Sequence, residues 1–379
     1  FNDVSDLNRI FMRLQLEYGT ELKERKSAII FDEVQLAPKA RQAIKYLVKD
    51  GRYDYIETGS LISIRKNVKN ILIPSEEVKL HMYPMDYEEF KWALGDTATI
   101  KLLQNCFNGR TSLGDATNRK LMRDFRLYML VGGMPQAVSA YLETNNLEKV
   151  DSVKRSIITL YEDDFNKIDQ SGNISKMFRQ IPAQLTSNAN RYLTWRATDG
   201  TRNSNLAELI SEMKESMVVN MAYHANDPSA GMALHQAPDK YKMFVGDTGL
   251  FVTLAFWDKK FTDNTIYHKL LSDKLNADLG YVYENVIAQM LKAAGHELYY
   301  YTFPTDSGKH NYEVDFLIAD EDKVSPVEVK SSGYKAHASL DAFCGKFSAR
   351  IKNKYLIYTK DMRKEADMLY MPVYMTMFL

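Results

Sequence analysis

An acidic pair, Asp32 and Glu33, directly follows the largely apolar run at residues 27–31. That run has the pattern of a strand buried on both faces of a parallel sheet. Because open α/β sheets bind ligands at the carboxyl edge of their strands, the two carboxylates could meet a nucleotide and its Mg²⁺ there. A bare acidic pair more often caps a helix after a buried strand, so the neighbouring motifs must decide between the two roles.

A strand, a helix and a second strand are predicted around this pair. Pro38 marks a helix start, the amphipathic stretch 40–48 continues the helix, and residues 53–56 form the next strand. Thr58 and Ser60 come directly after that strand. The pattern therefore predicts that their hydroxyls lie at the same sheet edge as the acidic pair.

A second set of charged residues lies near the C-terminus. In the strand predicted at residues 327–330, the side-chain period of two puts Glu328 and Lys330 on one face. Strand pairing could bring Asp315 beside Glu328, and Glu284 could approach from a preceding helix. Together these residues would form an oxygen-rich Mg²⁺ site with an adjacent lysine. A Glu-x-Lys strand alone is more often a surface salt bridge, so the order of the elements is what favours the site.

The middle of the chain is predicted to be mostly helical. Apolar residues recur at helical spacing from 87 to 160, and the Gly-Gly-Met-Pro segment at 132–135 interrupts them as an interhelical turn would. Short helices followed by strands at 218–223 and 241–245 suggest a winged helix. We favour protein contacts over DNA contacts for it, because its arginines form no dense basic stripe. These arginines are Arg191, Arg196 and Arg202.

The N-terminal motifs, in this order, resemble those of an AAA-type ATPase of the AAA_14-like group. Asp32 and Glu33 match Walker B, Thr58 and Ser60 match sensor 1, and residues 83–90 match the usual continuation. The resemblance implies that Asp32 holds Mg²⁺ through water and that Glu33 polarises the attacking water. Thr58 or Ser60 would sense the γ-phosphate.

Two features qualify this resemblance and one extends it. Glu57 stands where the family would have an apolar residue. No GxxxxGK[ST] loop occurs, so these residues by themselves should not hydrolyse ATP, and the chain, which begins with Phe1, is expected to start inside a larger protein. The 132–135 segment is similar to the GxP turn of related ATPases, which makes Pro135 a candidate nucleotide contact.

The C-terminal half resembles the DUF4143 family, whose pattern residues 242–250 fit. Its charged residues also resemble the PD-(D/E)xK nuclease-like core. By that resemblance Glu284, Asp315 and Glu328 would bind metal, and Lys330 would orient or activate water for attack on a phosphodiester. The fold could also be kept for binding without cleavage.

The expected fold class is therefore α/β and multidomain. A partial P-loop NTPase core spans 1–86, a helical lid 87–168, a winged-helix-like module 169–250 and a PD-(D/E)xK nuclease-like domain 251–379. The leading hypothesis is an AAA-family ATPase that couples ATP binding or hydrolysis, with Mg²⁺ as cofactor, to a nuclease-like domain whose partner is DNA or a protein. The alternatives are a Mg²⁺-dependent nuclease that uses Asp315, Glu328 and Lys330, and a non-catalytic interaction module.

The overall composition excludes little. Lys plus Arg and Asp plus Glu both number 49, so global charge does not favour nucleic acid or membrane. Cys106 and Cys344 lack the spacing of a zinc or redox site, which fits a reducing cytoplasm. No apolar run approaches the roughly 20 residues that span a bilayer.

Overall fold

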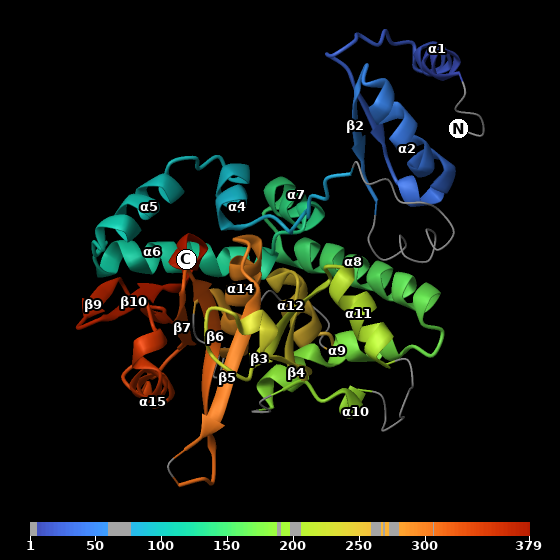
Figure 1. Cartoon of the computed structure of the whole chain (residues 1–379). Helices are drawn as coiled ribbons and strands as arrows, with labels where there is room; N and C mark the ends of the chain where they lie inside the picture. The colour runs from blue at the N-terminus through green and yellow to red at the C-terminus, as the bar shows by residue number, and fades with distance from the viewer. Residues whose placement is uncertain are drawn as a thin grey trace.

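The computed structural model describes residues 6–59, 77–187, 191–197, 206–258, 267, 270–272, 280–305 and 307–379. Figure 1 shows a small N-terminal lobe in blue and a larger body that contains the other described elements. A layer of teal and green helices lies along the large sheet of that body. The described parts are therefore mixed α/β, as the sequence predicts. None of the described helices is both long enough and apolar enough to cross a membrane.

The N-terminal lobe contains the predicted strand, helix and strand. The two strands are parallel, with Ile30 opposite Ile56. Pro38 occupies the first turn of the helix, and Gly51 ends it in the left-handed conformation that glycine adopts without a steric cost. The elements are α1 (Leu7–Tyr18), β1 (Ala28–Phe31), η1 (Val34–Leu36), α2 (Pro38–Asp50) and β2 (Asp54–Glu57).

Burial of the first strand differs from the sequence prediction. Ile29 and Phe31 pack on a small core that α1 and α2 contribute to, but Ile30 is 62% exposed and Ile56 is 50% exposed. The expectation of a strand buried on both faces is therefore wrong for the described residues. The physical reason is that, within the described residues, α1 and α2 contribute to the core on the face that carries Ile29 and Phe31, whereas Ile30 and Ile56 point to the exposed face.

The predicted helical segment after residue 87 is present. Its first helix has a capping box, in which Asp86 and Glu89 each accept a hydrogen bond from the other residue's backbone N–H. Tyr87, Phe125 and Tyr128 are buried and pack ring against ring. The helices are α4 (Tyr87–Ala93), α5 (Thr99–Gly109), α6 (Asp115–Val131), α7 (Pro135–Thr144) and α8 (Leu147–Ile168).

Short helices and a hairpin follow, as the sequence predicts. The hairpin strands pair antiparallel, with a register shift between Tyr223 and His224. The first of them also pairs parallel with a strand of the C-terminal segment, so the hairpin is not a separate wing. The elements are α9 (Asn173–Thr186), α10 (Thr194–Ala197), α11 (Leu206–Glu215), β3 (Val219–Ala225), η2 (Met232–Leu234), β4 (Gln236–Val245) and α12 (Thr248–Ala255).

The C-terminal segment completes an eight-stranded mixed sheet in the order β4-β3-β5-β6-β7-β8-β10-β9. One apolar core runs from Phe125 through Phe244 to Phe316, and a second core lies around Leu340 and Phe343. The predicted boundary at residue 250 therefore falls inside one packed body. The elements are α14 (Gly280–Ala293), β5 (Leu298–Pro304), β6 (Asn311–Asp320), β7 (Lys323–Val329), α15 (Ala338–Lys346), η3 (Ser348–Arg350), β8 (Lys354–Tyr358), β9 (Arg363–Glu365), β10 (Met368–Pro372) and η4 (Val373–Phe378).

Candidate functional site

Asp32, Glu33 and Thr58 meet at the carboxyl edge of β1 and β2. The Thr58 hydroxyl donates a hydrogen bond to the Asp32 carboxylate. The same hydroxyl oxygen accepts the Glu33 backbone N–H at 3.3 Å, and the Thr58 carbonyl accepts the Val34 N–H at 2.9 Å. The acidic pair and the threonine are thus held together as the sequence predicts. Ser60, the other predicted sensor residue, lies outside the described residues.

Glu33 has a left-handed backbone conformation, with φ 51° and ψ 46°. This region costs a non-glycine residue roughly 1–2 kcal/mol, because Cβ approaches the following carbonyl oxygen. Its backbone N–H donates to Thr58, and it begins η1 without a side-chain cap bond. The strained geometry turns the chain sharply at the sheet edge, and such strain clusters at functional sites.

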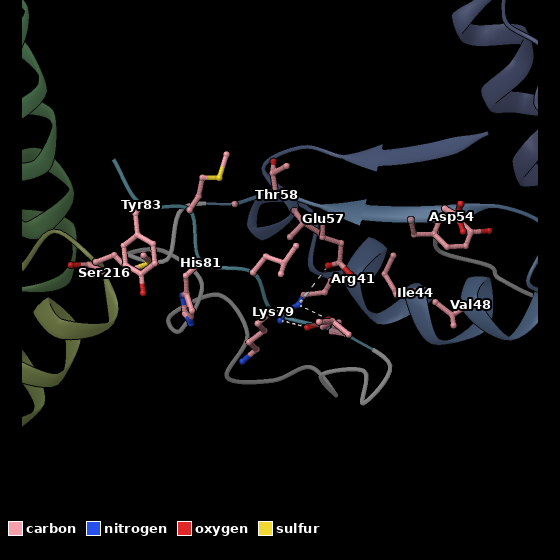
Figure 2. A pocket seen from close by; sticks show the side chains of 18 of the residues that line it. Arg41, Ile44, Val48, Asp54, Glu57, Thr58, Lys79, His81, Tyr83 and Ser216 are labelled. Atoms are coloured by element: carbon pink, nitrogen blue, oxygen red, sulfur yellow. Dashed lines mark hydrogen bonds and ion pairs between the residues drawn. The ribbon is translucent and has the colours of Figure 1, made fainter. Parts of the chain in front are cut away.

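Glu57, the departure from the family pattern, has a charged partner. Arg41 in α2 lies 3.8 Å from Glu57, measured between Arg41 Nε and Glu57 Oε2. The same guanidinium donates two hydrogen bonds to Glu77, at 3.1 and 2.8 Å (Figure 2). Burial raises the pKa of Glu57, and the neighbouring Glu77 raises it further, while Arg41 lowers it. An arginine on the adjacent helix therefore accommodates an acid at a position where an apolar residue was expected.

A cavity of about 930 Å³ lies between the N-terminal lobe and the helical body. Thr58 and Arg41 line it from the lobe, and Pro135 and Tyr161 line it from the helices. Figure 2 shows Thr58, Glu57 and Arg41 close together on the lobe side and Tyr83 and Ser216 on the other. Pro135, the predicted nucleotide contact, therefore shares a cavity with the predicted sensor threonine.

The two glycines before Pro135 are explained by packing. A Cβ on Gly133 would lie 2.1 Å from the Met85 carbonyl oxygen, and one on Gly132 would lie 2.4 Å from the Asp247 carboxylate. The Gly133 N–H donates to Asp247 Oδ2 at 2.6 Å, and its carbonyl accepts the Met85 N–H at 2.8 Å. The segment is thus a tight turn between α6 and α7 that also docks on α12, so its two glycines are explained by packing.

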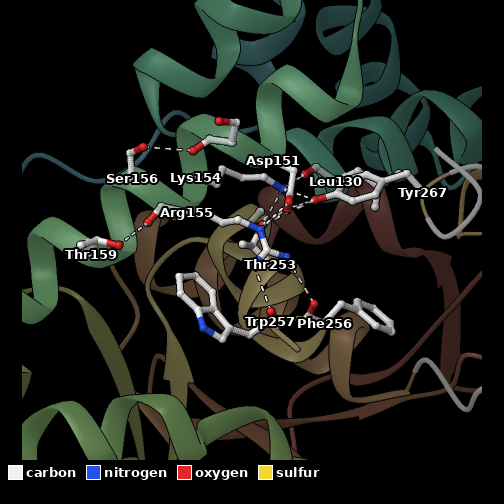
Figure 3. A network of polar contacts seen from close by, with 12 residues as sticks. Leu130, Asp151, Lys154, Arg155, Ser156, Thr159, Thr253, Phe256, Trp257 and Tyr267 are labelled. Carbon is white, nitrogen blue, oxygen red and sulfur yellow. Dashed lines mark hydrogen bonds and ion pairs between the residues drawn. The ribbon is translucent and has the colours of Figure 1, made fainter. Parts of the chain in front are cut away.

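Next to this turn lies a buried polar network that sequence reasoning missed (Figure 3). The Lys154 ammonium donates to the Leu130 carbonyl at 2.6 Å, the Gly249 carbonyl at 3.1 Å and the Tyr267 hydroxyl at 3.0 Å. Burial lowers the pKa of Lys154 to about 8, although Asp151 raises it. The signal was available, since Lys154 stands at helical spacing within the buried apolar face of α8.

The C-terminal charged residues also come together. Lys330 Nζ lies 2.8 Å from Glu328 Oε1, and the Val329 N–H donates to Asp315 Oδ2 at 2.7 Å. Glu284 reaches the group from α14, where it lies beside Lys242. All four predicted residues therefore belong to one cluster.

Two members of this cluster were not predicted, Lys242 on β4 and Glu313 on β6. The Lys242 ammonium donates to Glu313 and lies 3.7 Å from Glu284 Oε2, with only 8% of the lysine side chain exposed. The ammonium also lies 5.4 Å from the centroid of the Tyr300 ring. The sequence signal that could have predicted the role of Lys242 is its place inside the otherwise apolar run 241–245. We call these six residues the acid–lysine cluster: Lys242, Glu284, Glu313, Asp315, Glu328 and Lys330.

Burial dominates the electrostatics of the acid–lysine cluster. It raises the pKa of Glu328 to about 8, of Glu284 to about 7 and of Asp315 to about 6, because a desolvated carboxylate is costly to ionise. Burial lowers the pKa of Lys242, but the surrounding acids outweigh burial and hold that pKa above its usual value. The lysine is therefore the firmly charged member at the centre of the cluster.

The residues of the cluster fit a divalent ion poorly. Glu328 Oε2 is buried and lacks a hydrogen-bond partner, which by itself would suit a metal. However, the part of the chain that the structure describes contains no group of three His, Cys, Asp or Glu side chains that could hold one. The Lys242 ammonium lies against Glu284 and Glu313, where it repels a second cation.

The predicted arginine surface is sparse in the described residues. Arg191 and Arg196 are exposed, and the Arg196 guanidinium lies 5.4 Å from the centroid of the Trp195 ring. Arg202 lies outside the described residues. Only two of the three arginines can therefore be placed.

The comparisons with known proteins agree with the geometry of the N-terminal lobe. Residues 1–91 match the family model described as an AAA domain. This stretch includes the acidic pair, Thr58 and the segment after them. Residues 279–376 match DUF4143, a domain of unknown function, so both predicted resemblances are confirmed.

A third match was not predicted. Residues 122–260 match DUF8612, another domain of unknown function, which runs from α6 through the hairpin to α12. No curated protein and no solved structure matches the chain. The DUF8612 and DUF4143 regions share one sheet, because β3 and β4 lie in the DUF8612 region and β5–β10 lie in the DUF4143 region.

Proposed function

We propose that this chain is part of an AAA-type ATPase and that its N-terminal lobe supplies the Walker B and sensor 1 residues of the ATP site. The observation that carries the proposal is the joining of Asp32, Glu33 and Thr58 at one edge of two parallel strands, within the AAA-domain match. Asp32 would hold Mg²⁺ through water, and Mg²⁺ would neutralise phosphate charge. Glu33 would polarise the attacking water, Thr58 or Ser60 would sense the γ-phosphate, and Pro135 would contact the adenine.

We further propose the division of the chain that its sequence suggests. Residues 1–86 would be the partial ATPase core and residues 87–168 the helical lid. The winged-helix-like residues 169–250 and the nuclease-like residues 251–379 would act as one body, because their strands form a single sheet. ATP binding or hydrolysis would be coupled through the lid to this body and its partner, DNA or a protein.

Removal of the magnesium ligand tests the nucleotide site. In the full-length natural protein, Asp32→Asn should weaken binding of ATP with Mg²⁺ about tenfold, the effect of losing roughly 1.4 kcal/mol. Binding of ATP in EDTA should not change, because the asparagine keeps an oxygen that accepts the Thr58 hydroxyl. Titration with a fluorescent ATP analogue measures both affinities. Glu21→Gln, which removes an exposed carboxylate from the same lobe, is the control; equal Mg²⁺ dependence in wild type and Asp32→Asn would refute the proposed role.

A second candidate is a Mg²⁺-dependent nuclease, and the convergence of Asp315, Glu328 and Lys330 favours it. The position of Lys242 argues against it. We expect no cleavage of supercoiled plasmid or single-stranded oligonucleotide above the level in EDTA when Mg²⁺ is added. Cleavage that needs Mg²⁺ and disappears in Lys330→Ala would establish the nuclease instead. Without such cleavage, the nuclease-like residues 251–379 would serve for binding alone.

A further inference from the structure

We propose that Lys242 is the built-in cation of the acid–lysine cluster and takes the place that a divalent metal would hold among its acids. The inference rests on the proposed nuclease-like arrangement of Glu284, Asp315 and Glu328, and it identifies the counter-ion of that arrangement. Two regions of the chain contribute residues to this cluster. Lys242 lies in the part that matches DUF8612, whereas Glu284, Glu313, Asp315, Glu328 and Lys330 lie in the part that matches DUF4143.

The position of Lys242 is the first argument. In the sheet order, β3 and β5 separate β4 from β6, so the lysine reaches the acids across two strands. Its ammonium bonds to Glu313 and lies 3.7 Å from Glu284 Oε2, which comes from the helix α14. The lysine therefore joins the strand β6, through Glu313, to the helix α14, through Glu284.

The burial of Lys242 is the second argument. A lysine with 8% of its side chain exposed is costly to desolvate unless acids surround it. Here Glu284, Glu313 and Asp315 all stabilise its charge. The Tyr300 ring, 5.4 Å from the ammonium, adds a cation–π contact that fixes its position. The lysine is thus held in a buried position between Glu284 and Glu313.

The third argument is that the two lysines contact different carboxylates and differ in exposure. Lys330 bonds to Glu328 and is 29% exposed, so it lies at the more open side of the cluster. Lys242 is the more buried of the two and contacts two of the other three carboxylates, those of Glu284 and Glu313. A metal at Glu284 would have to displace an ammonium that is already in contact with that carboxylate. We infer that the body folds without a metal and excludes one.

The test compares Lys242→Met with Lys240→Met, which removes an exposed lysine from the same strand. Thermal unfolding is followed in EDTA and in millimolar MnCl₂, and Mn²⁺ binding is measured by calorimetry. Wild type and Lys240→Met should show no Mn²⁺ binding and no difference in Tm between the two buffers. Lys242→Met should unfold at least about 5 °C lower in EDTA, should regain most of that loss in Mn²⁺, and should bind Mn²⁺.

Three outcomes of this comparison overturn the proposal. The first is Mn²⁺ binding by the wild type that stabilises it. The second is a Lys242→Met protein as stable and as indifferent to Mn²⁺ as Lys240→Met. The third is destabilisation that Mn²⁺ does not reverse, because the lysine would then be only a structural ion pair.

A second pair of variants covers the case in which Lys242→Met does not fold. Lys242→Arg keeps the charge and should behave like the wild type, and Lys242→Met combined with Glu313→Gln should fold, since it removes one acid together with the lysine. Failure of both variants overturns the proposal. ATP binding and hydrolysis are not readouts here, so the outcome is independent of the proposed ATPase site.

Discussion

Replacement of Glu33 by Gln in the full-length natural protein is expected to slow ATP hydrolysis by at least about 100-fold, the usual effect of losing a residue that activates the attacking water. Affinity for ATP should stay within about twofold, because this role belongs to the transition state and not to the bound substrate. Glutamine keeps the size of the side chain and its hydrogen-bonding oxygen. Phosphate release measures turnover, and a fluorescent ATP analogue measures binding.

The matched control for this experiment is Glu24→Gln. Glu24 is exposed in the same lobe, so its replacement tests whether loss of any carboxylate there slows the enzyme. Turnover of Glu24→Gln should equal that of the wild type. Equal rates for Glu33→Gln and the wild type would remove the proposed ATPase role of the acidic pair, even though the pair lies at the edge of the sheet.

Replacement of Gly133 by Ala is expected to lower the free energy of unfolding by about 3 kcal/mol, at the upper end of the usual cost of overpacking. The added Cβ would lie 2.1 Å from the Met85 carbonyl oxygen and 2.7 Å from its nitrogen. Both atoms belong to the backbone, and Met85 and Gly133 are hydrogen-bonded to each other, so neither can move without breaking that bond. Urea denaturation with a tryptophan fluorescence signal measures the loss.

Gly345→Ala is the control for the same chemical change. Gly345 lies inside α15, and nothing lies within 4 Å of the position its Cβ would take. Alanine there should stabilise the protein by up to about 1 kcal/mol, since it favours helix over glycine. If Gly133→Ala were as stable as Gly345→Ala, the turn would not be the tight junction that the structure indicates. The hypothesis that the whole 132–135 segment contacts a nucleotide would then regain support.

The junction at Gly133 also links the lobe to the body. Met85 lies in the segment that follows the lobe, and Gly133 bonds both to it and to Asp247, which caps α12. Burial raises the pKa of Asp247, while the backbone N–H groups of Gly133, Leu250 and Gly249 lower it. The buried Lys154 contributes further positive charge there. A displacement of the segment after the lobe would therefore disturb the hydrogen bonds that Gly133 makes to Met85 and to Asp247.

Local features of this protein could be predicted from its amino-acid sequence. A continuous apolar run predicted the strand β1, residues 53–56 were predicted as the next strand, and apolar residues at helical spacing predicted α2 and the helices after residue 87. Short motifs also predicted the meeting of Asp32, Glu33 and Thr58, since parallel neighbouring strands end at one edge. Strand pairing and the side-chain period of two likewise predicted that Asp315 and Glu328 lie together on adjacent strands, which here are antiparallel.

The partners of the charged residues, in contrast, depend on how distant segments pack. Lys242 meets Glu313 across 71 residues of sequence, Gly133 meets Asp247 across 114, and Lys154 meets Tyr267 across 113. Periodicity shows which face of an element is buried, but it does not show what lies opposite that face. These contacts depend on strand order and on the packing of distant helices, and a buried charge is tolerated only where such packing supplies its counter-charge.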